Sequence, residues 1–325
     1  MATLKDVAAE CGLTVTTVSR VLNNRGYISK NTREKVEAAM KKLNYRPNEV
    51  ARSLSKKSTK TIGVIVPHIR HPYFAEMISN LENAASKQGY KIILCNSRGK
   101  SEMEKKYLEM CSSNRVAGVI IFSGGVALED FIGSNIPIVT VERFIESGTA
   151  GVECDNSEGG CLAAKHLIEK GCKNILHISG VNENAMPADE RASSFMQVCD
   201  EAGVVHREVA TDIQVYENQD YTDFLYETLK KNSDIDGVFA SSDLIAAQLI
   251  QVLTKLGRRV PEDVKIVGFD DVFIASITTP SITTIHQPIK EMAETAVRIL
   301  IDASEGKTVA KKTVLPVKIV ERETT

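Results

Sequence analysis

The chain has 325 residues, of which 43% are hydrophobic, and it carries 40 Lys and Arg against 42 Asp and Glu. This length and apolar content suffice for two or three domains with buried cores, which excludes an intrinsically disordered chain. The sequence contains no run of 18 apolar residues and no apolar secretory segment after Met1. We therefore expect a cytoplasmic protein that makes no contact with a membrane.

The charge is divided unevenly along the chain. Residues 1–60 hold 13 basic and 5 acidic side chains, whereas the remaining residues hold 27 and 37. A basic segment of this kind is typical of proteins that contact the phosphate backbone of nucleic acid. A solvated surface could produce the same charge, so the interpretation depends on the helical motifs within the segment.

Capping residues mark the start of two short helices. Thr3 is expected to cap a helix that begins at Leu4, and Asp6 can return the hydrogen bond. Gly12 ends this helix, and Thr14 caps a second one. This arrangement predicts a helix-turn-helix motif.

The second helix presents a polar face. Val18, Val21 and Leu22 form its inward side. The outward side consists of short side chains around one arginine, namely Val15, Thr16, Thr17, Ser19, Arg20 and Asn23. Such a face suits a major groove, where a guanidinium reads guanine and a methyl group contacts thymine. An ordinary surface helix would look similar, but the basic charge of the segment favours DNA binding.

A third helix completes the small core. Ser29 opens it, and Arg46-Pro47 is expected to end it, because the residue before a proline leaves the helical region. Asn48 then caps about two further helical turns, too few to be stable alone in water. We expect that segment to be helical only when a partner holds it.

These motifs resemble the lactose-repressor (LacI/GalR) family of bacterial transcription regulators, with matches in residues 3–8, 17–23, 32–36, 43–48 and 51–54. The resemblance implies a helix-turn-helix domain over 1–46 and a hinge helix and linker over 47–59. In such a hinge Leu54 would wedge into the minor groove and kink the duplex, although an apolar residue on a linker helix is the plainer interpretation. The DNA contacts it implies are Thr3, Thr14, Val15, Thr16, Thr17, Ser19, Arg20, Asn23, Ser29, Thr32, Tyr45, Asn48 and Leu54.

Residues 60–325 alternate β-rich runs with helical stretches. Strands are expected at 61–66, 91–95, 118–122, 136–141, 174–178, 237–240 and 265–269, and helices at 73–88, 157–170, 191–202, 244–256 and 289–304. The alternation, with mostly apolar strands, predicts parallel sheets covered by helices on both faces.

The resemblance continues to about Glu321 and includes periplasmic sugar-binding proteins. It implies an effector-binding and dimerisation domain of two lobes over 60–325, with the chain crossing between them near Asp155, Ser242 and Ile282. The expected fold is thus an all-α helix-turn-helix head plus an α/β periplasmic-binding-protein-like body of two doubly wound parallel-sheet lobes.

A ligand of such a body binds at the carboxyl ends of the strands. Matching the family's positions assigns the effector site to Tyr73, Phe74, Arg143, Arg191, Ser242, Asp270 and Gln287. Aromatic faces, arginines, carboxylates and an amide suit a polyol, whose hydroxyls both donate and accept. Tyr73 and Phe74 could instead belong to the core, and Glu142 could only tether Arg143. Ser242 stands where the family often has asparagine, which leaves the sugar undefined.

The sequence indicates neither catalysis nor a cofactor. It contains no Gly-x-Ser-x-Gly elbow, no Walker loop, and no Gly-x-Gly-x-x-Gly after the first strand. Seven cysteines without Cys-x-x-Cys spacing, and His68 and His71 without a cysteine partner, predict no metal site.

We therefore predict a homodimeric transcriptional regulator that binds a near-palindromic operator. It would repress a carbohydrate-utilisation operon and leave DNA when a sugar or sugar phosphate binds. Two alternatives remain: a purine-type repressor whose corepressor tightens DNA binding, and a sugar-binding module without regulatory DNA contact. A tetramer is not expected, because only four residues follow Glu321.

Overall fold

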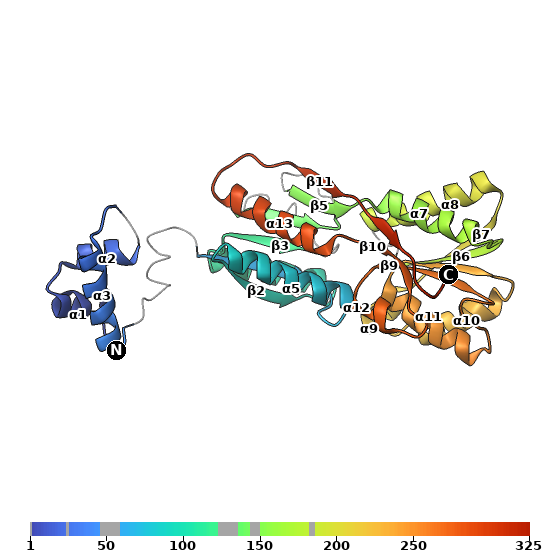
Figure 1. Cartoon of the computed structure of the whole chain (residues 1–325), viewed down its shortest axis with the longest axis horizontal. Helices are drawn as coiled ribbons and strands as arrows, with labels where there is room; N and C mark the ends of the chain where they lie inside the picture. The colour runs from blue at the N-terminus through green and yellow to red at the C-terminus, as the bar shows by residue number, and fades with distance from the viewer. Residues whose placement is uncertain (1, 24–25, 46–58, 123–135, 144–149, 182–185) are drawn as a thin grey trace. The chain divides into compact units, whose positions relative to one another are not determined.

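The computed structural model describes residues 2–23, 26–45, 59–122, 136–143, 150–181 and 186–325 (Figure 1). The chain divides into two compact units, Met1–Thr59 and Lys60–Thr325, here called the head and the body. Within the described ranges, no helix is both long and apolar enough to span a bilayer.

In the described residues of the head lie three helices, α1 (Leu4–Cys11), α2 (Val15–Leu22) and α3 (Lys30–Lys42). Thr3 and Asp6 form the expected capping box of α1, and the hydroxyls of Thr14 and Ser29 cap the next two helices. The buried core of the head consists of Val7, Ala8, Val18, Val21, Val36 and Ala39. Valine and alanine at helical spacing thus hold the three helices together.

The third helix ends earlier than expected. Its last residue is Lys42, with Leu43 as C-cap, so Arg46-Pro47 does not terminate it and that prediction was wrong. Asn44 takes the left-handed conformation with φ of 46°, and the Tyr45 N–H donates to the carbonyl of Met40 over 2.9 Å. A left-handed asparagine satisfies the last carbonyls of a helix and thereby stops it.

Lobe 1 of the body contains a six-stranded sheet in the order β11-β5-β4-β3-β1-β2. Its strands are β1 (Thr61–Val66), β2 (Lys91–Asn96), β3 (Gly118–Ile121), β4 (Ile138–Val141), β5 (Ala150–Cys154) and β11 (Lys312–Leu315). Its helices are α5 (Pro72–Lys87), α6 (Ser101–Ser113) and α13 (Ile289–Ser304). All its strand pairs are parallel.

Lobe 2 contains a second six-stranded sheet in the order β12-β10-β9-β8-β6-β7. Its strands are β6 (Asn174–Ser179), β7 (Val205–Ala210), β8 (Gly237–Ala240), β9 (Lys265–Asp270), β10 (Thr283–His286) and β12 (Lys318–Val320). Its helices are α7 (Asn156–Glu169), η2 (Pro187–Asp189), α8 (Glu190–Ala202), α9 (Ile213–Asn218), α10 (Thr222–Lys231), α11 (Asp243–Lys255) and α12 (Phe273–Ile277). Only β12 runs antiparallel to its neighbour.

Helices cover both faces of each sheet (Figure 1). In β1, Ile62 and Val64 belong to the core beneath α5 and α13, whereas Ile65 belongs to the core beneath α6. Gly63 shares the α6 face, and a Cβ there would lie 2.6 Å from the Cys111 sulfur. The apolar character of both strand faces is what makes the fold doubly wound.

The chain crosses between the lobes at three places. It enters lobe 2 at Asp155, the N-cap of α7, and returns to lobe 1 at 287–288, between β10 and α13. It crosses again between β11 and β12. The crossing expected near Ser242 was wrong, because β8 and β9 on either side belong to one sheet, and the crossing placed near Ile282 comes only after β10.

Candidate functional site

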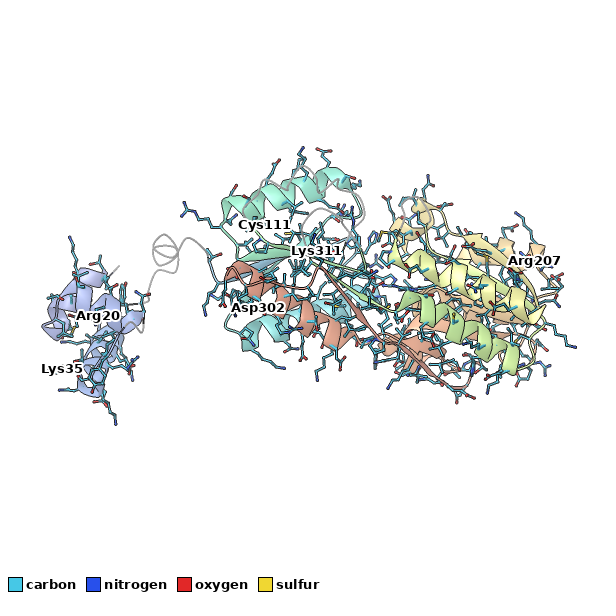
Figure 2. The ribbon with its side chains drawn as sticks, turned by 90° about the horizontal axis from the view of Figure 1, so that it is seen from above. Arg20, Lys35, Cys111, Arg207, Asp302 and Lys311 are labelled. Atoms are coloured by element: carbon cyan, nitrogen blue, oxygen red, sulfur yellow. The ribbon has the colours of Figure 1, made fainter. Side chains whose placement is uncertain are left out.

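The outward face of α2 is the candidate DNA-reading surface of the head. Thr16 and Arg20 are exposed, Val15 is 40% exposed, and Val18 and Val21 are buried beneath them. Figure 2 labels Arg20 on this unit. Arg20 and its neighbour Thr16 therefore lie on the solvent-exposed side of this helix.

The other head residues assigned to DNA fall into three groups. Thr3, Thr14, Ser29 and Thr32 take part in helix-capping hydrogen bonds, and the Asn23 side chain bonds to the Ser19 carbonyl over 2.8 Å. Thr17, Ser19 and Tyr45 are half-buried. Asn48 and Leu54 lie outside the described residues.

A cavity of about 580 Å³ lies between the two lobes of the body. Its wall includes residues at or just after the carboxyl ends of strands from both sheets, namely Pro67, Phe122, Glu142, Ser179, Ser241, Asp270 and Gln287. Open parallel sheets bind ligands at this edge. The cavity therefore lies where the strand pattern predicts a ligand.

Six of the seven residues assigned to the effector line this cavity: Tyr73, Phe74, Arg191, Ser242, Asp270 and Gln287. Arg143 is not among the lining residues, and Glu142 lines the wall in its place. Glu142 has φ of 53°, so the chain turns directly after β4. Tyr73 is at once buried core and cavity wall, so the two interpretations of this residue do not exclude each other.

Glu142 takes part in a network of hydrogen bonds that connects the two lobes. Its Oε1 accepts the Cys154 N–H over 2.7 Å, and its Oε2 accepts the Asn156 amide over 3.0 Å. The Arg191 Nε donates to the Asn156 Oδ1 over 2.6 Å, and Arg191 Nη2 lies 3.6 Å from Glu142 Oε2. These contacts form a path from the end of β4 in lobe 1 to α8 in lobe 2.

Arg191 is fixed on its remaining sides as well. Its Nη1 donates to the Ser241 carbonyl over 3.0 Å, and its guanidinium lies 3.5 Å from the centre of the Phe269 ring. Gly160 in α7 allows this approach, because a Cβ there would lie 2.2 Å from the Arg191 carbonyl oxygen. The close packing of α7 on α8 thus positions the guanidinium at the cavity.

Asp270 and Gln287 form a second buried pair. The Gln287 amide donates to Asp270 Oδ1 over 2.7 Å. Burial, reinforced by the nearby Asp243, raises the pKa of Asp270 well above its ordinary value. Asp270 also has φ of 112°, a left-handed conformation that a side chain rarely adopts, and such strain concentrates at binding sites.

Three buried polar atoms of the cavity wall have no hydrogen-bond partner among the described residues. They are the hydroxyl oxygens of Tyr73 and Ser179 and the Oε1 of Gln287. A buried polar group without a partner costs about 1–3 kcal/mol. A ligand that supplies the missing bonds would recover this cost.

Several lining residues were not expected from the sequence, namely His71, His177, Ser179, Tyr216 and Tyr221. Tyr216 lies on the short helix α9, and its ring meets His68 of lobe 1 edge-on at 5.0 Å. His71 caps α5, and burial lowers its pKa to about 4, so it is neutral at neutral pH. In the described part of the chain, no group of three His, Cys, Asp or Glu could hold a metal ion.

His177 makes the stability of the body depend on pH. It stacks on Phe239 at 4.7 Å, and burial lowers its pKa to about 4 from the ordinary 6.5. As the pH falls, His177 takes up a proton in the unfolded chain before it does so in the folded protein. Its contribution to the free energy of unfolding is therefore fully present above pH 6.5. It is lost as the pH falls to 4 and amounts to roughly 3 kcal/mol.

We expect His177→Phe to flatten the fall in unfolding free energy between pH 6.5 and 4, measured by urea titration at several pH values. Asp243 acts in the opposite direction, because its pKa is raised to about 7 by burial and the native state gains stability from it at low pH. The difference between the variant and the parent protein in this pH dependence gives the contribution of His177, because Asp243 is present in both. If the free energy of unfolding fell equally steeply with pH in the variant, His177 would not be the source of the pH dependence.

The three-helix head and the two-lobed body define a class: bacterial regulators that join a helix-turn-helix domain to a periplasmic-binding-type domain. Residues 3–48 match the model of the bacterial regulatory proteins of the lacI family, and residues 164–325 match a periplasmic binding protein-like domain. The chain is 39% identical to a ribose operon repressor of Halalkalibacterium halodurans, over 100% of this chain and 97% of the relative. The chain belongs to the lacI family.

Other relatives and structures agree with this placement. A sucrose operon repressor of Streptococcus mutans is 36% identical over 99% of both chains, and the repressor PurR of Yersinia enterocolitica is 35% identical over 99% and 96%. The lac repressor dimer bound to operator and an anti-inducer has a TM-score of 0.87 at 27% identity, covering 99% and 98%. A regulator from Alkaliphilus metalliredigens in complex with D-xylulofuranose has a TM-score of 0.74 at 34% identity, covering 82% and 99%.

Proposed function

We propose that this protein is a transcriptional repressor of a carbohydrate operon that a small sugar releases from DNA. The observation that carries this proposal is the cavity between the lobes, whose wall holds buried hydroxyl and amide oxygens without partners. Sugar hydroxyls both donate and accept hydrogen bonds, and the apolar face of a sugar ring packs on aromatic side chains such as Phe74 and Phe122.

The roles of the three parts of the chain follow. Residues 1–46 would read the operator, 47–59 would form the hinge, and 60–325 would bind the effector and a second subunit. Two heads in a twofold dimer match a near-palindromic operator, and the operator-bound dimer of the lac repressor supports this arrangement.

Effector binding would act on the contact between the lobes. Arg191 and Glu142 connect the lobes at the cavity, so a ligand that touches both sides changes the balance between open and closed bodies. A ligand can shift that balance only by its difference in affinity for the two states. Release of DNA therefore requires that the sugar prefer the body conformation with lower operator affinity.

A purine corepressor is the second candidate. Relatives named PurR are 35% identical to this chain, and the cavity wall contains Phe74, Phe122, Tyr216 and Tyr221, on which a planar base could stack. The direction of the response separates the two candidates. A sugar inducer weakens operator binding, whereas a corepressor tightens it.

The test begins with selection of operator sequences from a random near-palindromic DNA pool by the full-length protein. Binding to the selected fragment is then titrated with free pentoses, hexoses and sucrose, with their phosphates, and with purines. Release by one sugar supports the proposal. Tighter binding with a purine would replace it with the corepressor mechanism, and failure to select any sequence would overturn the DNA-binding role.

Arg20→Ala is expected to lower affinity for the selected operator and to relax its base specificity. A guanidinium that reads one guanine contributes about 1–3 kcal/mol, and a dimer carries two copies. The matched control is Lys35→Ala in α3, an exposed head residue that Figure 2 also labels. Its effect should be smaller and equal for all sequences. Anisotropy titrations of both variants on the operator and on scrambled DNA measure affinity and specificity. If the Arg20 variant kept the parent's preference for the operator over scrambled DNA, Arg20 would not be a base-reading residue.

A further inference from the structure

We propose that the body of this protein makes its own contact with DNA, through three exposed cations of lobe 1, Lys60, Lys91 and Arg115, here called the basic edge. The partner of this surface is the sugar-phosphate backbone and not the bases. The contact adds a second surface to the DNA-binding function, on which it rests. Three features of the body support it: the place of these residues in the sheet, the charge of the matching residues in lobe 2, and the point where the chain enters the body.

The three residues lie together at the amino-terminal ends of neighbouring strands. In lobe 1 the parallel strands β2, β1 and β3 lie side by side (Figure 1). Lys60 directly precedes β1, Lys91 is the first residue of β2, and Arg115 stands three residues before β3. The N–H of Lys91 donates to the carbonyl of Lys60 over 3.0 Å, and the N–H of Ala117 donates to the carbonyl of Thr61 over 2.7 Å. The ladder of the sheet thus holds the cations at one edge.

The width of this edge matches a run of phosphates. Neighbouring strands are about 4.8 Å apart, so three of them cover about 10 Å. One strand of duplex DNA carries one phosphate in about 3.4 Å of the helix axis, so about three consecutive phosphates lie within this width. Lys and Arg side chains neutralise phosphates without reading the sequence. The basic edge therefore suits the backbone of one DNA strand.

No carboxylate belongs to the connections that carry these cations. Residues 59–61, 88–91 and 114–118 contain neither Asp nor Glu. At the end of α13, Asp302 and Glu305 lie within 2.8 Å of the Lys307 ammonium, so these two acidic residues already have a cationic partner. Figure 2 labels Asp302 at this position. Within the connections themselves the charge is entirely positive.

Lobe 2 repeats the same strand arrangement without the basic edge. Its strands β7, β6 and β8 are ordered as β2, β1 and β3 are in lobe 1. The positions that match the basic edge hold Lys173 before β6, Val205 at the start of β7, and Asp234 three residues before β8. The carboxylate of Asp236 also accepts the N–H of Lys173 over 2.8 Å. Helix ends that favour cations precede the strands of both lobes, so neither the fold nor the helix dipoles require three cations here.

The chain from the head enters the body at this edge. The head ends at Thr59 and β1 begins at Thr61, which makes Lys60 the first residue of the body. DNA that the head binds is therefore tethered to the basic edge through the chain. A tethered contact is intramolecular and acts at a high effective concentration, so weak phosphate contacts add to the affinity. An acidic segment of another protein would have no such advantage, which favours DNA as the partner.

The test removes the three charges in the full-length protein. The basic-edge variant combines Lys60→Gln, Lys91→Gln and Arg115→Asn. Asparagine replaces the arginine because this residue has φ of 52°, a left-handed conformation that asparagine tolerates. Urea unfolding and binding of the effector show whether the body of the variant is intact.

A control variant removes the same number of charges from lobe 2. It combines Lys173→Gln, Lys230→Gln and Lys231→Gln, at three exposed positions. Lys230 lies over the ring of Tyr226 as Lys60 lies over a tyrosine ring in lobe 1, so both variants lose one such contact. A general effect of net charge on DNA affinity would be equal in the two variants.

Anisotropy titrations of each variant on the operator and on scrambled DNA, over a series of salt concentrations, measure the contact. In the basic-edge variant we expect the plot of log affinity against log salt to be shallower by about 3 if one body of the dimer touches DNA and by about 6 if both do. Near 0.1 M salt its affinity should fall at least about 10-fold on both DNAs. The preference for the operator should persist, in contrast to Arg20→Ala, and the control variant should keep the parent's salt dependence.

A charge-preserving variant separates charge from shape. Lys60→Arg, Lys91→Arg and Arg115→Lys together keep all three cations, and we expect them to retain the parent's affinity and salt dependence. If this variant instead loses affinity as the basic-edge variant does, the residues act through the local structure and the proposed phosphate contact is overturned.

The remaining outcomes distinguish this contact from the function on which it rests. A basic-edge variant that matches the control variant overturns the contact, leaves DNA binding to the heads, and leaves the edge to an acidic protein partner or to solvent. If the parent protein itself selects no DNA, the DNA-binding function fails, and the contact fails with it.

Discussion

Arg191→Ala is expected to abolish the effector response and to destabilise the body by about 3–5 kcal/mol. The buried carboxylate of Glu142 and the amide oxygen of Asn156 would each lose the guanidinium, and the cavity would lose the side chain that joins its two sides. Urea unfolding and operator titration with the identified effector measure the two losses. Operator binding without effector should persist, because the head is a separate compact unit.

Two further variants serve as controls for Arg191→Ala. Arg191→Lys keeps the charge but cannot reproduce the fork of donors to Asn156 and Ser241, so it should recover only part of the stability. Arg207→Ala removes an arginine on β7, labelled in Figure 2, whose pair with Asp234 is 39% and 53% exposed. An exposed ion pair contributes little, so we expect the free energy of unfolding to change far less in this variant than in Arg191→Ala. Equal effects of Arg191→Ala and Arg207→Ala would contradict the proposed role of the network.

Phe273→Asp is expected to split the proposed homodimer and to weaken operator binding by about 100- to 10,000-fold, because two linked heads bind far more tightly than one. The helix α12 exposes 72% of Phe273 and 58% of Ile277, an apolar surface that suits a second subunit. Sedimentation measures the oligomeric state, and anisotropy measures operator affinity. The control is Val205→Asp, at a residue of the edge strand β7 that is 52% exposed. A dimeric Phe273 variant with normal operator affinity would place the subunit interface elsewhere.

Local patterns were sufficient for many of the regular elements, although the buried strands β5 and β10 and the helices α6 and α10 were not predicted. The capping residues Thr3, Thr14 and Ser29 open the three head helices as predicted, and the strand expected at 61–66 coincides with β1. Short-range hydrogen bonds and continuous apolar runs depend on neighbouring residues, which the sequence displays directly. The strands β7 and β12 were not predicted, because they are partly exposed and lack the continuous apolar run on which the prediction of a strand depended.

The cavity was predicted less completely. Residues at strand ends, such as Asp270, could be located because parallel strands carry ligand sites at their carboxyl ends. Arg143 is not among the lining residues, because Glu142 takes a left-handed conformation and turns the chain directly after β4. Tyr216 could not be predicted, since it lies on the helix α9 and not at the carboxyl end of a strand.

The helix-turn-helix head and the alternation of strands and helices could be predicted from the amino-acid pattern, because both depend on contacts between near neighbours. The crossings between the lobes, and the meeting of Glu142, Asn156 and Arg191, could not be predicted in this way. These residues are brought together by the order of strands in two sheets and by the close approach of α7 and α8. Such contacts join distant parts of the chain, and no local pattern encodes them.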